Sequence, residues 1–102
     1  MISQMGKDIM FILGEKLVTV LRLNWITMHL IEYIHEIMQK NNVLEYDDVQ
    51  FTKEDVCTMI QLTTKTMNKY RDSASDYRSI IKELNELKQT CRNGTVIYLH
   101  IC

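Results

Sequence analysis

The scarcity of chain-breaking residues is the feature of this sequence that most constrains its fold. The chain has no proline, and its three glycines stand at positions 6, 14 and 94. Proline and glycine most often interrupt regular elements, so long stretches without them favour helices joined by short connections. For a chain of 102 residues we expect a mainly α-helical protein with a core of modest size.

The apolar residues of the first 45 positions repeat with the spacing of a helix. They alternate steps of three and four, which is the heptad pattern of a coiled-coil seam. The seam residues are Met10, Leu13, Leu17, Val20, Asn24, Thr27, Ile31, Ile34 and Met38. We therefore expect residues 1–45 to form a long N-terminal helical arm that supports a homodimer. A strand near 16–23 is the competing interpretation, because KLVTVLRL is β-branched and partly alternating.

Residues 46–102 form the second expected unit. Thr52 is a good helix N-cap, and the acidic Glu54 and Asp55 suit the first turn of the helix that follows. The pair Gln61-Leu62 predicts a very short break, after which Thr63 begins a second helix over residues 63–72. Residues 51–72 are thus expected to form a helix-turn-helix within this unit.

An amphipathic helix and a strand are expected to complete this unit. Apolar residues again repeat at steps of three and four, at Tyr77, Ile80, Leu84, Leu87 and Cys91. Asn93-Gly94 predicts a helix C-cap or, as the alternative, a hairpin turn. The final TVIYLHIC predicts a short terminal β-strand, which needs a neighbouring strand for stability.

The charge and the cysteines limit the classes of function. Residues 1–50 carry four basic and seven acidic side chains, and residues 51–102 carry eight basic and six acidic ones, so a net charge of −1 hides a mildly basic second half. Three widely spaced cysteines give no disulfide framework. With neither a signal peptide nor a membrane-spanning segment in the sequence, we expect a cytoplasmic protein that does not bind membranes.

No catalytic, metal or cofactor motif is found in the sequence. His29 and His35 lie six positions apart and do not share a helix face. His100, Cys102 and Cys91 are too loosely spaced to indicate zinc. We expect no enzyme activity, no metal and no cofactor.

One stretch carries a specific signal, FTKEDVCTMIQLTTKTMNKYRD at residues 51–72. An aromatic residue and Thr precede an acidic pair and Val-Cys, and Leu-Thr, Lys-Thr-Met and Tyr-Arg follow after a short interval. This pattern resembles the helix-turn-helix of excisionase-like and MerR-like DNA-binding proteins, which include small regulators of bacterial mobile elements.

The resemblance implies a sequence-specific binder of double-stranded DNA, a transcriptional regulator or an excision accessory factor. Its second helix would enter the major groove. Thr63 and Thr64 would then lie near a phosphate, Lys65, Asn68 and Lys69 would face the bases, and Arg71 would hold a phosphate. The expected DNA-binding residues are Thr63, Thr64, Lys65, Asn68, Lys69 and Arg71.

Two alternatives remain open at this point. The broad apolar stripes favour a helical adaptor or inhibitor that binds another protein. The chain is also compatible with a fragment of a longer regulator.

Overall fold

The computed structural model describes residues 8–91 and 96–101. The described chain begins with an antiparallel hairpin of β1 (Asp8–Leu13) and β2 (Lys16–Arg22). Gly14 has a φ of +67° in the two-residue loop between these strands. Glycine adopts this left-handed conformation without steric cost, which explains why the tight loop forms at this position.

Three helices and their short connections follow the hairpin. A single 3₁₀ turn, η1 (Trp25–Thr27), leads into α1 (Met28–Asn41), and Asn24 and Thr27 cap that turn reciprocally. The chain continues through η2 (Tyr46–Asp48) and the short β3 (Gln50–Phe51) into α2 (Lys53–Lys69). A third turn, η3 (Arg71–Ser73), joins α2 to α3 (Ala74–Thr90), and β4 (Ile97–Ile101) ends the described chain.

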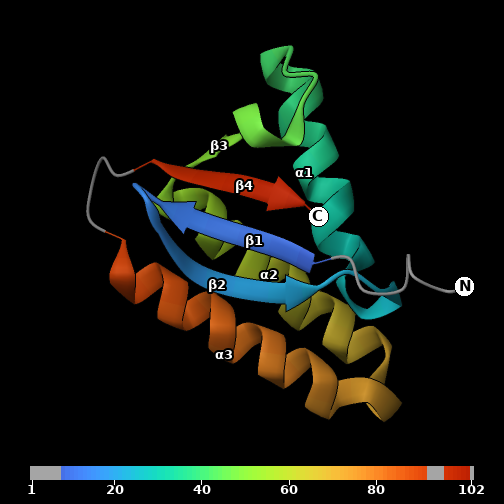
Figure 1. The fold of residues 1–102 in the computed structure, drawn as a ribbon. Coiled ribbons are helices and arrows are strands. Elements are labelled where there is room, and N and C mark those ends of the chain that lie inside the picture. Colours follow the sequence, from blue (N-terminus) through green and yellow to red (C-terminus); the bar gives the residue numbers. More distant parts are fainter. Residues whose placement is uncertain (1–7, 92–95, 102) are drawn as a thin grey trace, which may run out of the picture.

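The strands form one antiparallel sheet in the order β2-β1-β4-β3. The last strand, β4, lies between β1 and β3, so the first and last strands of the described chain are paired in the centre of the sheet (Figure 1). All three helices of the described residues pack on one face of this sheet, and none of them covers the other face, which we call the open face (Figure 1).

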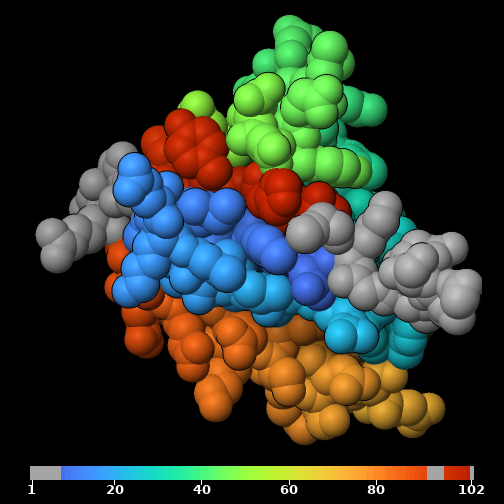
Figure 2. Space-filling model, viewed as in Figure 1, coloured from blue at the N-terminus to red at the C-terminus, as the bar shows by residue number. Residues whose placement is uncertain are grey.

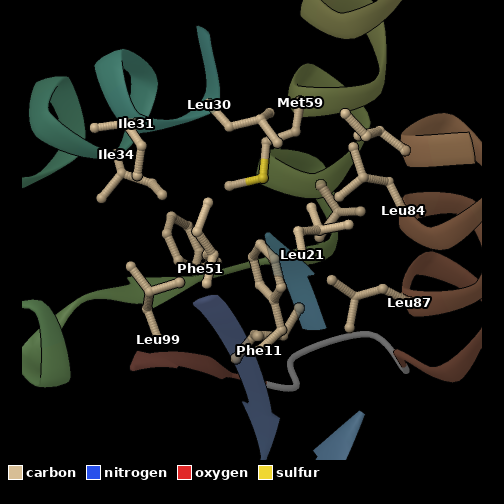
Figure 3. Close-up of a cluster of buried hydrophobic side chains, with 14 of the residues drawn as sticks. Phe11, Leu21, Leu30, Ile31, Ile34, Phe51, Met59, Leu84, Leu87 and Leu99 are labelled. Atoms are coloured by element: carbon tan, nitrogen blue, oxygen red, sulfur yellow. The ribbon is translucent and has the colours of Figure 1, made fainter. Parts of the chain in front are cut away.

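One hydrophobic core lies between the sheet and the helices. Strand residues such as Phe11 and Leu99 point toward Leu30 and Ile34 of α1, and toward Leu84 and Leu87 of α3 (Figure 3). Met59 of α2 and Phe51 of β3 fill the centre of this cluster (Figure 3). Because every helix and strand contributes buried side chains, the fold depends on the whole described chain.

The mainly α prediction is wrong. Residues 8–22, which were expected to begin a helical arm, form the β-hairpin instead, and the N-terminal helix begins only at Met28. Ile9, Phe11 and Leu21 enter the core with the period of two that defines a strand. Asn24 caps a 3₁₀ turn and sets no coiled-coil register.

The expected helix-turn-helix of residues 51–72 is also wrong. The helix α2 runs without interruption from Lys53 through Gln61-Leu62 to Lys69. The hydroxyl groups of Thr63, Thr64 and Thr66 donate hydrogen bonds of 2.7–2.9 Å to the carbonyls four residues earlier. These bonds accommodate the three threonines inside the helix. Thr63, which was expected to begin a second helix, is therefore an interior residue of α2. The chain turns after Tyr70, between α2 and α3.

Candidate interaction surface on the open face of the sheet

The open face of the sheet presents two rows of side chains across three strands. Met10 of β1 lies opposite Val20 of β2 and His100 of β4. In the next row, Ile12 of β1 lies opposite Leu17 and Tyr98. The register shifts between Phe11 and Ile12, which leaves one extra residue in β2 and brings Leu17 level with Ile12. Figure 2 views the molecule from this side, with β1, β2 and β4 at the surface.

Five of these six side chains are non-polar or aromatic, and three of the five are substantially exposed. The exposed fractions are 50% for Leu17, 42% for Val20 and 38% for Tyr98. Met10 and Ile12 lie half-buried between them. An antiparallel sheet covered on one side normally presents polar residues to solvent on the other. We therefore define Met10, Ile12, Leu17, Val20 and Tyr98 as the apolar sheet patch.

Polar and charged groups border the apolar sheet patch. Next to β4 lies Asp47 of η2, whose Oδ1 atom is 2.8 Å from Nδ1 of His100 on β4, and both side chains are exposed. The Gln50 amide donates a 3.4 Å hydrogen bond to the Tyr98 hydroxyl. At the opposite border, Arg22 is exposed at the end of β2, level with Asp8. An apolar centre with a polar rim is the composition of a protein-binding surface.

The structure places the six predicted DNA-binding residues on α2 and η3, outside the apolar sheet patch. Thr64, Lys65, Asn68, Lys69 and Arg71 are exposed. Asn68, Lys69 and Arg71 also line one surface hollow, which they share with Tyr70, Asp72 and Ser73. The exposed cations therefore gather near the end of α2.

Thr63 differs from the other five because it is fully buried. Its hydroxyl donates a 2.7 Å hydrogen bond to the Met59 carbonyl and lies 2.8 Å from His29 Nε2 of α1. With the hydroxyl proton directed toward the Met59 carbonyl, the Nε2–H of His29 is assigned as the donor in the second bond. The side chain of Thr63 thus joins α1 to α2.

His29 is half-buried between the helices. Burial lowers the pKa of His29 below its usual value of 6.5, although the Ile26 carbonyl and the Glu32 carboxylate act in the opposite direction. The neutral ring therefore has an unprotonated Nδ1, which is buried and makes no hydrogen bond. The centre of the ring lies 5.9 Å from that of Tyr77 on α3. This arrangement favours an uncharged histidine that holds the helices together.

A second exposed feature, an aromatic group, lies near the end of α2. Trp25 is 61% exposed and meets Tyr70 edge-on, with 6.4 Å between the ring centres. Tyr70 in turn stacks on Tyr77 at 6.5 Å, and Lys69 Nζ lies 5.5 Å from the centre of the Tyr70 ring. This group is adjacent to the exposed cations.

Neither the apolar sheet patch nor Trp25 was identified as a candidate site from the sequence. The partial alternation of residues 16–23 was the available signal for β2. It did not show which face of the strand is covered, because apolar residues occupy both faces.

The described residues hold no group of three or more His, Cys, Asp and Glu side chains placed to bind a metal ion. In the same part of the chain, none of the helices is long and apolar enough to cross a membrane. Comparisons with protein-family models, with curated proteins and with solved structures find no match to this chain.

Proposed function

We propose that this chain is a protein-interaction module that binds a non-polar protein surface through the apolar sheet patch. The observation that carries the proposal is the exposure of Leu17, Val20 and Tyr98 on a sheet face that none of the described helices covers. Covering these side chains removes non-polar area from water, which is the main favourable contribution to protein association.

The geometry of the patch also supports a binding role. Its side chains stand on paired strands, so their positions are fixed by the sheet before a partner arrives. A preformed surface loses less conformational freedom on binding than a loop does. Cys57 and Cys91 are both free thiols, which fits the reducing cytoplasm that we propose as its compartment.

A retention experiment with matched variants tests this function. The face variant Leu17→Lys/Val20→Lys places two charges on the patch. The control variant Gln39→Lys/Gln61→Lys adds the same charge at two exposed positions of α1 and α2. Each purified protein is immobilised, exposed to cell extract, and the retained proteins are quantified by mass spectrometry. Circular dichroism verifies that each variant is folded.

We expect specific proteins to be retained by the wild type and by the control variant, and to be lost from the face variant. The reason is that a lysine ammonium group placed inside a non-polar contact must lose its hydration without gaining a partner. If the folded face variant retains the same proteins in the same amounts as the wild type, the proposed function is wrong.

Binding of double-stranded DNA is a second candidate function, which we propose for the end of α2. The supporting observation is that Lys65, Lys69 and Arg71 are exposed together. No ion pair neutralises them within residues 8–91 and 96–101. Because α2 is continuous, such binding would rest on contacts with phosphates, which are strongly salt-dependent.

Fluorescence anisotropy with labelled duplex DNA at several salt concentrations tests this second candidate. Lys65→Ala/Lys69→Ala should weaken binding and reduce its dependence on salt. Arg78→Ala/Lys82→Ala removes two exposed cations from α3 and serves as the matched control. Equal binding by both variants, or no binding by the wild type at low salt, would exclude DNA binding at this position.

A further inference from the structure

We infer that the apolar sheet patch binds a second copy of this chain, face to face, so that two sheets form a β-sandwich. This inference rests on the proposed function, since it names the partner of the same surface. Sheets that pack in this way lie about 10 Å apart with their strands within about 30° of one another.

The patch has the distribution of residues that a two-fold contact requires. In a symmetric dimer the same surface meets itself, so each part of it must tolerate its symmetry-related counterpart. The central strand β1 contributes Met10 and Ile12, with β2 on one side and β4 on the other. A two-fold axis parallel to β1 places β1 on β1 and β2 on β4 of the second copy.

This arrangement brings mostly non-polar groups into contact, and His100 is the one polar side chain of the two rows. Leu17 of one copy lies over the row of Tyr98 in the other, and Val20 lies over the row of His100. Met10 and Ile12 meet their own counterparts at the axis. The two rows hold no Asp, Glu, Lys or Arg, and the nearest charged residues on this face, Asp8 and Arg22, lie in the next row at the rim.

The charges at the rim of the patch select the direction of the axis. Arg22 ends β2, and on the far side of β4 Asp47 is bonded to His100. When β2 of one copy lies over β4 of the other, Arg22 comes within reach of the Asp47 carboxylate of the second copy. Symmetry produces this contact twice. Complementary charges at a rim favour one orientation over others and increase the rate of association.

The area of the patch sets the expected strength. Three strands spaced about 4.8 Å apart, each about 20 Å long, present a sheet face of about 300 Å². Two such faces give about 600 Å² before the relief of the side chains is counted, which is small beside the roughly 1,200–2,000 Å² of stable specific interfaces and fits a weak, transient contact. A reversible dimer with a dissociation constant of about 1–100 µM is expected.

Sedimentation velocity over about 1–500 µM protein tests the inference. The wild type should pass from monomer to dimer in this range, and Val20→Lys should remain a monomer. Leu17→Gln is a milder change to the same surface, and it should weaken the dimer. It replaces Val20→Lys as the test if Val20→Lys does not fold. The control is Lys82→Asp, which replaces a basic by an acidic side chain at an exposed position of α3 and should leave the dimer unchanged. It is matched in charge to the Arg22→Asp variant that tests the orientation.

The proposed orientation is tested by exchanging charges. Arg22→Asp should weaken the dimer about tenfold, because each contact then joins two carboxylates, and Arg22→Asp/Asp47→Arg should restore most of the affinity. Failure of the double variant to restore association overturns the orientation. A wild type that stays monomeric at every concentration overturns the inference. The retention experiment above then still decides whether the same face binds a different protein.

Discussion

Replacement of Thr63 by valine tests the packing of α1 against α2 most directly. Valine has nearly the same shape as threonine, so Thr63→Val leaves almost no cavity, but it removes the acceptor of the His29 Nε2–H bond of 2.8 Å. The Nδ1 atom of the same ring already makes no hydrogen bond. The variant therefore leaves His29 with no hydrogen bond from its ring.

The cost of this change can be worked out from the contacts. A buried donor without a partner costs about 1–3 kcal/mol. Loss of the bond to the Met59 carbonyl adds little, because that carbonyl also accepts the helical amide bond. We expect Thr63→Val to lower the free energy of unfolding by about 1–3 kcal/mol, and the melting temperature by about 4–8 °C for each kcal/mol.

A double-mutant cycle with His29→Leu separates this bond from other effects of the substitution. In the His29→Leu background no donor is left unpaired, so Thr63→Val should cost at least about 1 kcal/mol less than it does in the wild type. Urea unfolding monitored by circular dichroism at pH 7.5 measures all four proteins. A coupling energy below about 0.3 kcal/mol would mean that the two side chains do not interact, and it would refute the packing described here.

Three further outcomes follow from local features. The positive φ of Gly14 costs an alanine about 1 kcal/mol, and no atom lies within 4 Å of the added Cβ, so thermal unfolding of Gly14→Ala should show this backbone cost alone. Burial lowers the pKa of His29 below 6.5, so below that pH the unfolded chain binds more protons than the folded one. The free energy of unfolding should therefore be highest above pH 6.5 and fall as the pH drops below it. Urea unfolding at several pH values measures this slope, which His29→Leu should remove. Burial raises the pKa of the Cys91 thiol, so alkylation of the native protein mapped by mass spectrometry should modify Cys57 much faster than Cys91, and equal rates would contradict its burial.

The C-terminal half of the sequence shows what periodicity can predict. The expected apolar stripe from Tyr77 to Cys91 matches the buried face of α3. Thr52 is the N-cap of α2, as expected, and forms a reciprocal cap with Asp55. These features are local, because each depends on residues within one or two helical turns.

The helix-turn-helix prediction failed for a reason that is not local. A Thr-Thr pair after Gln61-Leu62 favours a new helix start when the chain is considered alone. In the folded protein, Thr63 faces His29 of α1, thirty-four positions earlier, and the helix continues through it. Tertiary contacts of this kind override the local preference of threonine for caps.

The failed prediction of the N-terminal arm and the proposed binding surface have the same physical origin. If the outer face of the hairpin were polar, non-polar and polar residues would alternate along residues 8–22. That alternation would have predicted two strands. Here Ile9 and Phe11 enter the core while Met10 and Ile12 occupy the opposite face, so the alternation disappears and a helical spacing can be fitted. That second non-polar face is the apolar sheet patch, and its energetic cost in water is the reason to expect a partner there.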